Sequence, residues 1–286
     1  MMSDKVVVIT GASDGIGAAA ARLLKAQGAR VVIVGRSPQK TEAVAKELGV
    51  PYYLADFARL DDVRRLATEL KRDFPRIDVL ANNAGGIMDK KRTMTVDGHE
   101  MTIQVNHLAP FLLTNMLLDT LVASKATIIA TSSLAHARAG KLDLADIDLE
   151  HGYSSSGAYG KAKLMNILFT KELHRRYRAQ GIAAAAFHPG LVRTSFSSES
   201  DTGFGYGLIY KTILKNFLIS PVKGADTLVW LATSEPGRDW QPGGYYVKRK
   251  IKEPSKQAQD AKLARDLWEL SAKLTEPAQV QQIDRS

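Results

Sequence analysis

Short apolar runs alternate along the chain with longer segments in which apolar residues recur at helical spacing. The short runs predict buried strands, and the longer segments predict helices between them. The predicted strands are residues 6–9, 31–34, 52–54, 78–80, 127–130, 183–187 and 244–247, and the predicted helices are residues 16–27, 40–48, 61–74, 108–122 and 159–177. Nearly continuous apolar strands separated by helices are typical of a parallel sheet covered on both faces. The pattern therefore predicts a doubly wound α/β fold with about seven strands in a single domain.

The same pattern suggests how residues 1–286 divide within that domain. Residues 1–135 are expected to bind a cofactor, and residues 136–250 to supply catalysis and substrate contacts. Residues 195–220 are predicted to form a lid, because Tyr210, Leu214 and Phe217 recur there at helical spacing. An alternative is that this segment also contacts a membrane surface. The tail, residues 254–286, has a helical pattern, which could pack on the body or on another subunit.

Composition narrows the classes of function. The chain has no cysteine, which excludes disulfides, a thiolate nucleophile and cysteine-based metal sites. We expect no metal site. The net charge of +9 comes mostly from scattered lysines and arginines, and no nucleic-acid-binding module accompanies it. We find neither a signal peptide nor an apolar stretch near the roughly 20 residues of a transmembrane segment. These observations favour a cytoplasmic protein.

A glycine-rich turn follows the first predicted strand and opens a helix. Such a turn lets backbone N–H groups approach a pyrophosphate, and the helix N-terminus favours its negative charge. The strand–turn–helix context favours a Rossmann-type dinucleotide site over a plain tight turn. The candidate cofactor contacts here are Gly11, Ser13, Asp14, Gly15, Ile16 and Gly17.

Two further motifs follow in order. Asn82-Asn83-Ala84-Gly85 comes after the fourth predicted strand, and Tyr159-Gly160-Lys161-Ala162-Lys163 lies on a predicted helix. With the glycine-rich turn, this ordered set resembles the short-chain dehydrogenase/reductase family over nearly the whole chain. The resemblance implies additional cofactor contacts. It places Asp56 and Phe57 near the adenine, Asn83, Ala84 and Gly85 near a ribose, and Pro189, Gly190, Val192 and Thr194 near the nicotinamide.

The end of the second predicted strand bears on the choice of nicotinamide cofactor. An acidic residue there would bind the ribose hydroxyls of NAD, but the strand ends Val34-Gly35-Arg36. The guanidinium of Arg36 can pair with a 2′-phosphate, which favours NADP(H). Asp14, in the glycine-rich turn, lies where family members often carry a second basic residue. NAD(H) therefore stays an alternative cofactor.

Tyr159 and Lys163 are four residues apart on a predicted helix, so their side chains share one face. A lysine ammonium near the phenol would favour the phenolate and lower the tyrosine pKa from its ordinary value near 10. The pair would then serve as a general acid and base, and Lys163 and Tyr159 would also contact the cofactor. Ser133, after the fifth predicted strand, can stabilise negative charge on a substrate oxygen. Strand alternation and the family resemblance favour it over Ser132.

Asn106 is expected at the start of the long apolar helix. The resemblance implies that it holds a water that relays protons to Lys163, and a buried asparagine bonded to backbone is the alternative. His107 beside it is expected to be structural. Three segments resemble the retinol dehydrogenase-like branch of the family: Ser132-Ser133-Leu134-Ala135-His136, Asn106-His107-Leu108 and Asn166-Ile167-Leu168-Phe169.

These observations predict an NADP(H)-dependent carbonyl reductase or alcohol dehydrogenase. The branch resemblance implies a hydrophobic substrate, and the family resemblance implies a homodimer or monomer. A different class of function stays open, namely a non-catalytic module that binds NADP(H) as a redox signal, because a fold does not dictate catalysis. The complete set of Asn106, Ser133, Tyr159 and Lys163 favours the enzyme. Nucleic-acid binding rests on net charge alone and is not expected.

Overall fold

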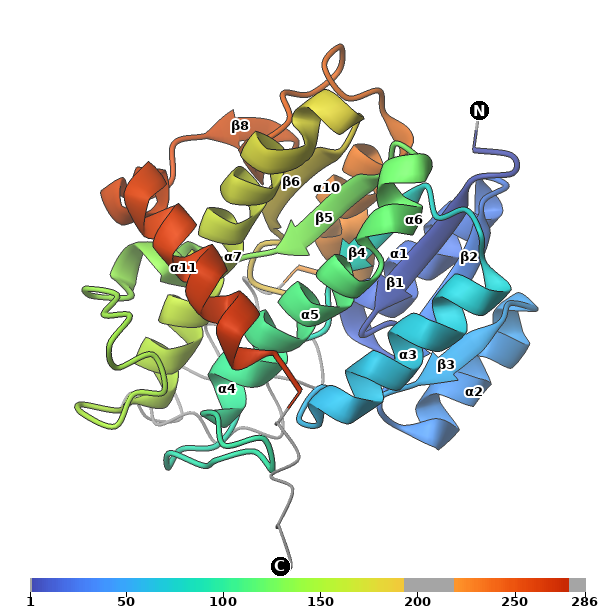
Figure 1. The fold of residues 1–286 in the computed structure, drawn as a ribbon. Coiled ribbons are helices and arrows are strands. Elements are labelled where there is room, and N and C mark those ends of the chain that lie inside the picture. Colours follow the sequence, from blue (N-terminus) through green and yellow to red (C-terminus); the bar gives the residue numbers. More distant parts are fainter. Residues whose placement is uncertain (1, 193–218, 278–286) are drawn as a thin grey trace, which may run out of the picture.

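The computed structural model describes residues 2–192 and 219–277. Eight of its strands form one sheet in the order β3-β2-β1-β4-β5-β6-β7-β8 (Figure 1). They are β1 (Val6–Thr10), β2 (Arg30–Gly35), β3 (Tyr52–Leu54), β4 (Val79–Asn82), β5 (Thr127–Thr131), β6 (Ala183–His188), β7 (Tyr245–Val247) and β8 (Lys250–Lys252). The first seven are parallel, and β8 pairs antiparallel with β7. The predicted Rossmann-type doubly wound sheet is confirmed.

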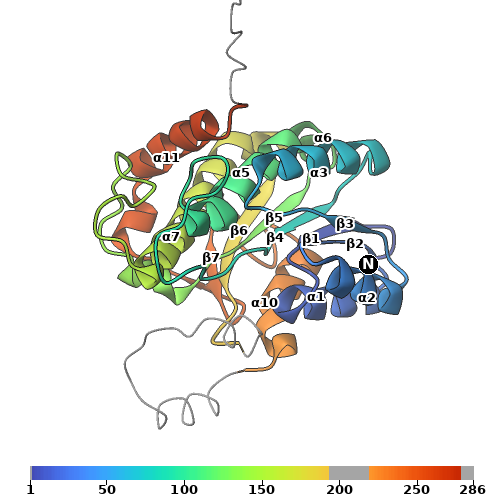
Figure 2. The same cartoon turned by 90° about the horizontal axis from the view of Figure 1, so that it is seen from below.

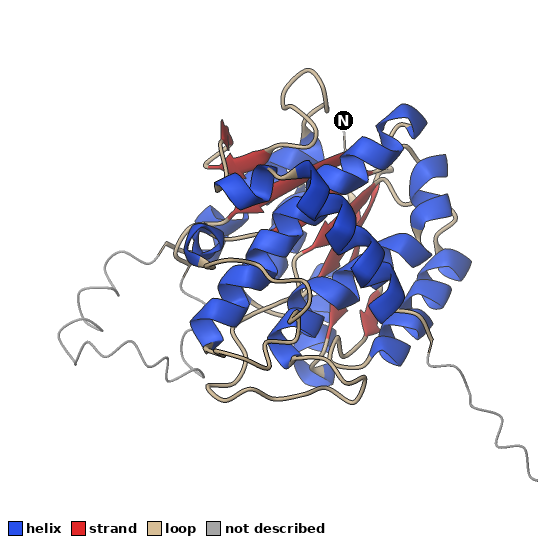
Figure 3. Cartoon of the chain, turned by 60° about the vertical axis from the view of Figure 1, so that its left-hand side comes forward, coloured by secondary structure: helices blue, strands red, loops and turns tan. Residues whose placement is uncertain are grey.

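Helices cover both faces of this sheet, which lies between two layers in Figure 2. The named α-helices are α1 (Gly15–Ala26), α2 (Pro38–Leu48), α3 (Leu60–Asp73), α4 (Met101–Ile103), α5 (Ala109–Met116), α6 (Leu118–Ala123), α7 (Ser155–Tyr177), α10 (Pro221–Thr233) and α11 (Ala261–Leu274). Shorter helical turns are η1 (Gln104–Leu108), η2 (Leu134–Arg138), η3 (Arg178–Gln180) and η4 (Lys256–Gln259). In Figure 3 the strands, in red, lie largely behind the helices of one face.

Alternation along β1 directs its side chains into two different hydrophobic clusters, one on each face of the sheet. Val7 and Ile9 of β1 pack in the core that α1, α2 and α10 complete. Val6 and Val8, which point the other way, pack in the core formed with α3, α5, α7 and α11. Because both faces are buried, the strands carry no polar alternation, which is why they read as continuous apolar runs. The order reverses between β1 and β4, and the carboxyl ends of these strands border a crevice suited to a ligand.

The apolar helix predicted at residues 108–122 begins earlier and is interrupted. It starts with α4 at Met101, continues through η1, which is a π-helical turn, and resumes as α5 and α6. Pro110 has no N–H to donate to the carbonyl of Asn106, so the regular ladder cannot pass through this point. The turn widens, and the N–H of Ala109 bonds to the carbonyl of Gln104, five residues earlier. Asn106 therefore lies within the π-helical turn and not at a helix start.

The strand β8 is the one element of the sheet that the sequence pattern does not reveal. Its three residues, including two lysines, are all exposed and form no apolar run. It follows β7 through Lys248 and Arg249, whose φ angles are 51° and 60°. Two residues with positive φ form the tight turn that suits a hairpin. The sheet thus ends in an antiparallel edge strand.

The helical pattern of the tail corresponds to α11, which packs on the body of this chain. Trp268, 6% exposed, stacks on Phe169 of α7 with ring centroids 5.6 Å apart. The same indole meets Phe111 of α5 edge-on at 5.1 Å. Residues from three distant parts of the sequence therefore close the core beneath α11.

Candidate active site

The glycine-rich turn is shaped by close backbone approaches. Gly11 has a φ of +65°, which favours glycine, and a Cβ on Gly17 would overlap the carbonyl oxygen of Gly11. The side chain of Asp14 caps α1 by accepting a hydrogen bond from the N–H of Gly15 at 2.6 Å. The first turn of α1 is thereby held directly against the end of β1. This geometry exposes backbone at a helix N-terminus, as an anionic pyrophosphate requires.

Asn83 joins the glycine-rich turn to the segment after β4. Its Nδ2 donates to the carbonyl oxygen of Thr10 at 3.0 Å. In return, the hydroxyl oxygen of Thr10 accepts from the backbone N–H groups of Asn83 and Ala84, both at 3.0 Å. Two motifs that are more than seventy residues apart therefore form one hydrogen-bonded unit.

A cleft of about 210 Å³ opens over this unit at the carboxyl ends of the strands. It brings together predicted residues of the glycine-rich turn, the segment after β4, the Tyr–Lys motif and the Pro-Gly segment. The predicted residues that line it are Gly11, Asp14, Gly15, Ile16, Gly17, Asn83, Ala84, Gly85, Tyr159, Lys163 and Pro189. Gly86 and Thr131 complete the lining.

Six of the described predicted cofactor contacts lie outside that lining: Gly190 and Val192 after β6, and four residues around β2 and β3. Ser13 packs against the backbone of Gly35, and Arg36 is exposed at the carboxyl end of β2. Asp56 caps its own loop by accepting from the N–H of Ala58 at 3.0 Å. The ring of Phe57, 5% exposed, packs in the hydrophobic core instead of facing the cleft. Burial in the core stabilises the fold by removing this apolar ring from water.

The segment after β6 is anchored to the region before α10. Gly190 has a φ of +96°, and Val192 forms an isolated bridge with Ile219. Val192 also packs against Gly224, where an added Cβ would lie 2.6 Å from its Cγ2. Thr194 and residues 195–218 of the predicted lid lie outside the described residues, and residues 219 and 220 are the part of the lid that the structure describes.

Tyr159 and Lys163 occupy one face of α7, as their spacing predicts. The ammonium nitrogen of Lys163 lies 5.3 Å from the centroid of the Tyr159 ring. It donates to the carbonyl oxygen of Thr131, at the end of β5, over 3.2 Å. Only 2% of Lys163 is exposed. The lysine is therefore held between the sheet and the phenol, at the floor of the cleft.

Burial shifts both groups away from their ordinary pKa values. It lowers the pKa of Lys163 to about 7, because desolvation disfavours the ammonium. It also raises the pKa of Tyr159 to about 12, although a hydrogen bond with Ser133 acts in the opposite direction. The expected lowering of the Tyr159 pKa by Lys163 does not appear: desolvation is the largest contribution, and the hydrogen bond with Ser133 is the one that lowers the pKa.

The two neighbouring serines point to different environments. Ser132 is fully buried, and its hydroxyl donates to the backbone carbonyl of Lys163 at 2.8 Å. Ser133 is partly exposed, and its hydroxyl bonds with Tyr159. Its Oγ also accepts from the N–H of Ala135 at 3.2 Å, which caps η2. The structure thus places the Ser133 hydroxyl beside Tyr159 and Ser132 in the packing between β5 and α7.

The side chain of Asn106 is fully used by the backbone. Its Nδ2 donates to the carbonyls of Gly86 and Thr102, each at 2.8 Å, and its Oδ1 accepts from the N–H of Gly86 at 2.9 Å. A Cβ on Gly85 would overlap that Oδ1 and would lie 3.3 Å from the Lys163 nitrogen. Asn106 therefore fixes the backbone that lies over Lys163, as in the alternative for a buried asparagine.

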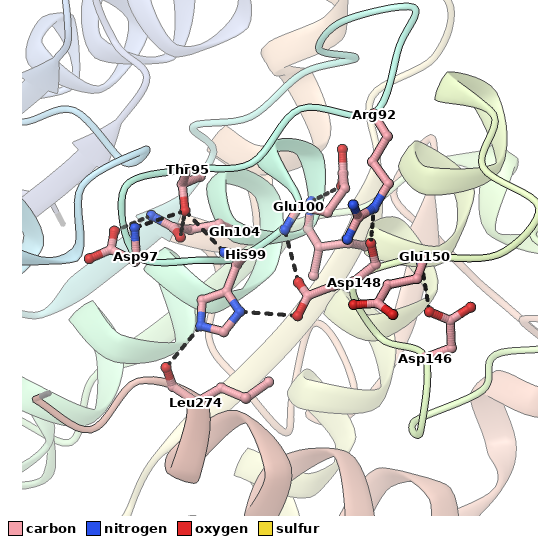
Figure 4. A network of polar contacts seen from close by, with 11 residues as sticks. Arg92, Thr95, Asp97, His99, Glu100, Gln104, Asp146, Asp148, Glu150 and Leu274 are labelled. Atoms are coloured by element: carbon pink, nitrogen blue, oxygen red, sulfur yellow. Dashed lines mark hydrogen bonds and ion pairs between the residues drawn. The ribbon is translucent and has the colours of Figure 1, made fainter.

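A polar network holds the loop that leads from the cleft to α4 (Figure 4). His99 bonds through Nδ1 to Asp148 and through Nε2 to the carbonyl of Leu274, each at 3.2 Å. Asp148 also accepts from the N–H of Glu100 at 2.8 Å, and buried Glu100 caps α4. Burial raises the pKa of Glu100. The network ties the helix that carries Asn106 to the end of α11.

Sequence reasoning missed Thr131, whose carbonyl accepts from both Lys163 and Asn166, at 3.2 and 3.1 Å. A backbone acceptor has no residue-type signature, so its position at the end of β5 is the only signal. His107, by contrast, has the structural place expected of it. It bonds to the hydroxyl of Ser271 at 2.9 Å, and complete burial lowers its pKa to about 4.

Two features are absent from residues 2–192 and 219–277. No group of three or more His, Asp or Glu side chains in this part of the chain is placed to hold a metal ion. No helix there is both long and apolar enough to cross a bilayer.

Comparison with known proteins agrees with the geometry of the cleft. Residues 5–203 match the family model described as short chain dehydrogenase. This chain belongs to the short-chain dehydrogenase family. The match includes the glycine-rich turn, the Asn83 segment and the Tyr–Lys pair, so the unit that lines the cleft lies within the family's own region.

Relatives place this short-chain dehydrogenase on a branch of the family. A provisionally named daunorubicin C-13 ketoreductase from Streptomyces sp. (strain C5) is 43% identical, over 94% of this chain and 91% of the relative. Retinol dehydrogenase 13 from Homo sapiens is 37% identical, over 94% of this chain and 84% of its own. Retinol dehydrogenase 14 from Mus musculus is 35% identical, over 95% of this chain and 86% of the relative. The chain is therefore an oxidoreductase of the retinol dehydrogenase-like branch.

A solved structure supports the fold over nearly the full length. A protein from Mycobacterium Paratuberculosis described as uncharacterized superposes with a TM-score of 0.76 at 33% identity, covering 96% of this chain and 94% of that one. A short-chain dehydrogenase/reductase from Caenorhabditis Elegans, solved with cofactor, superposes with a TM-score of 0.64 at 26% identity, covering 81% of this chain and 89% of that one.

Proposed function

We propose that this short-chain dehydrogenase is an NADP(H)-dependent oxidoreductase that interconverts a hydrophobic aldehyde or ketone and the corresponding alcohol. One observation supports this most strongly. The hydroxyl of Ser133 bonds with the phenol of Tyr159, and Lys163 lies 5.3 Å from the same ring, at the floor of a cleft with a glycine-rich wall. Residues 1–135 supply most of that wall, and residues 136–250 supply the proton chemistry.

The lining suits a dinucleotide because its glycines have no side chain at the points where the backbone must come close to the ligand. A Cβ at Gly17 would lie 2.8 Å from the Cα of Ala12, and one at Gly11 would lie 2.7 Å from the Cα of Ala84. These positions leave the helix N-terminus open to a pyrophosphate. A bound nicotinamide would supply or accept the hydride, while the residues of this chain bind it, orient it and move the proton.

The proton step belongs to Tyr159. In reduction its phenol donates a proton to the carbonyl oxygen, which the Ser133 hydroxyl also binds. The resulting phenolate would lie beside Lys163. Since burial lowers the pKa of this lysine to about 7, it can take up a further proton from solvent near neutral pH as the phenolate forms. The neutral pair of phenol and amine then becomes a pair of opposite charges, and no net charge is buried.

NADP(H) is preferred because Arg36 is exposed at the carboxyl end of β2, where the sequence offers no acid for the ribose hydroxyls. Arg36→Asp should weaken NADPH binding by about 10-fold to 100-fold, since a charge-assisted hydrogen bond contributes about 1.5–3 kcal/mol. NADH binding should change little or improve. Fluorescence titration of both cofactors measures this, and an equal loss for the two would show that Arg36 does not select the phosphate.

The test of function is NADPH consumption with a panel of carbonyl compounds. The panel includes retinal, daunorubicin and long-chain aldehydes, because the relatives are named for retinol and daunorubicin. Tyr159→Phe removes the proton donor but keeps the ring, so turnover should fall by about 100-fold or more while NADPH still binds. Retained turnover in this variant would refute the mechanism. NADPH binding without turnover by the unaltered protein would favour the redox-sensing module.

The proposal extends to the substrate, the location and the oligomeric state of the protein. The substrate is a hydrophobic small molecule, and the protein acts in the cytoplasm as a monomer or homodimer without nucleic acid. Peripheral contact with a membrane through residues 195–220 stays an alternative for that segment. Size-exclusion chromatography with light scattering decides between the two oligomeric states.

A further inference from the structure

His136 lies in η2, three residues after Ser133, and only 4% of it is exposed. Its Nδ1 lies 2.6 Å from the backbone carbonyl oxygen of Ser133. Its Nε2 lies 3.2 Å from the backbone nitrogen of Ser255, 119 residues away in the sequence. The imidazole therefore bridges the residue that holds the substrate oxygen and the segment that follows β8.

These two contacts fix the tautomer of the ring. A carbonyl oxygen can only accept, so Nδ1 must carry the proton, and a backbone N–H can only donate, so Nε2 must offer its lone pair. A neutral ring satisfies both contacts, whereas an imidazolium would set a second N–H against that of Ser255. Burial lowers the pKa of His136, which keeps the ring in this neutral state.

The segment that follows β8 is itself bound to the loop after η2, the short helix that Ser133 caps. The Nε2 of Gln257 donates to the carbonyl of Gly140 at 2.7 Å, and its Oε1 accepts from the N–H of Leu142 at 2.9 Å. Tyr245 of β7 meets the His136 ring edge-on, with centroids 5.0 Å apart. Besides the carbonyl of Ser133, the imidazole thus contacts the N–H of Ser255 and the ring of Tyr245.

The carbonyl of Ser133 accepts from both the ring and the backbone N–H of His136, at 2.6 and 3.2 Å. Its Oγ accepts from the N–H of Ala135 at 3.2 Å. These bonds define the backbone of Ser133 and direct its hydroxyl toward Tyr159. We propose that His136 is a positioning residue, which sets the Ser133 hydroxyl for the substrate oxygen and makes residues 254–259 a structural part of the active site.

This inference rests on the proposed function, and its test separates the two. His136→Phe keeps the aromatic contact with Tyr245 but removes both ring nitrogens. His136→Asn keeps an N–H close to the position of Nδ1, so it should still donate to the Ser133 carbonyl. His174→Phe, which changes a partly buried imidazole near the far end of α7, is the control for loss of stability.

We expect kcat to fall by about 10-fold to 100-fold in His136→Phe, because a misplaced catalytic group costs rates of that order. The Kd for NADPH should stay within about threefold, since no cofactor contact changes. His136→Asn should recover most of kcat. His174→Phe should lower the melting temperature with kcat unchanged. A His136→Phe variant with the kcat of the unaltered protein would overturn the positioning role, and so would a His136→Asn variant as slow as His136→Phe.

A second measurement needs no substrate. A long-range ¹H–¹⁵N spectrum near neutral pH should show an Nδ1–H tautomer whose signals disappear in His136→Asn. An Nε2–H tautomer or an imidazolium would overturn the inference. Retained turnover in Tyr159→Phe, or no turnover in the unaltered protein, would overturn the proposed function, and the positioning role would fall with it. The tautomer would still report whether the two contacts exist.

Discussion

Lys163 should make the stability of this protein rise with pH, and Lys163→Met should remove that rise. The folded-state pKa of the buried lysine is about 7, whereas its ordinary value is 10.5. Between these two values the unfolded chain binds the proton and the native state does not. Stability therefore increases with pH across this interval. Below pH 7 both states are protonated, and the native state bears the full cost of a buried ammonium.

The size of this pH dependence follows from the one proton that Lys163 takes up when the protein unfolds in this pH range. The slope is about 1.4 kcal/mol per pH unit, so the free energy of unfolding should rise by about 2–3 kcal/mol between about pH 8 and pH 10. Tyr159 sets the upper limit of the useful range. Burial raises the pKa of Tyr159 to about 12, so the native phenol keeps a proton that the unfolded chain loses above about pH 10. The free energy of unfolding therefore falls with pH in that range.

The assay is urea unfolding at several pH values, in parallel for the unaltered protein and Lys163→Met. Methionine matches the length of the stem and carries no charge, so the difference between the two slopes isolates the lysine. Lys161→Met, on the same helix but at a partly exposed position, is the matched control and should keep the rise. Equal slopes for the unaltered protein and Lys163→Met would show that the lysine is charged in the native state, and the reasoning would be refuted.

Two other predictions test the cleft and the tail. Gly17→Ala should weaken NADPH binding by at least about tenfold, because its methyl group would overlap the Gly11 carbonyl and displace the turn; fluorescence titration measures this, and an unchanged Kd would show that the turn does not hold the cofactor. Trp268→Ala should lower the free energy of unfolding by about 3–5 kcal/mol, since it removes a buried indole stacked on Phe169; a loss under about 1 kcal/mol in urea unfolding would mean that α11 adds little to the core.

Much of the fold could be predicted because burial on both faces leaves a strong local signal. The seven parallel strands coincide with apolar runs, and the spacing of Tyr159 and Lys163 alone places both on one face of α7. The π-helical turn around Asn106 could not be located, although Pro110 marks it, because a proline signals a break without specifying how the ladder adapts. The strand β8 gives no apolar run, since its residues are exposed.

The electrostatics of the site depended on packing that no motif records. Proximity of a lysine predicts a lower tyrosine pKa, yet the structure buries both groups, and desolvation moves the two pKa values in opposite directions. Strand alternation and family resemblance already favoured Ser133 over Ser132, but the bonding partner of each serine, Tyr159 for Ser133 and the carbonyl of Lys163 for Ser132, follows from the course of the backbone after β5.

The sequence by itself determined the class of fold, the order of the motifs and the residue types available for hydride and proton chemistry. These are local properties, set by side-chain periodicity and by the conformations that glycine permits. The tertiary structure alone decided which distant groups meet, such as His136 with Ser255 and Lys163 with the carbonyl of Thr131. Such contacts join residues 119 and 32 positions apart through backbone atoms, which every residue carries and which leave no trace in residue identity.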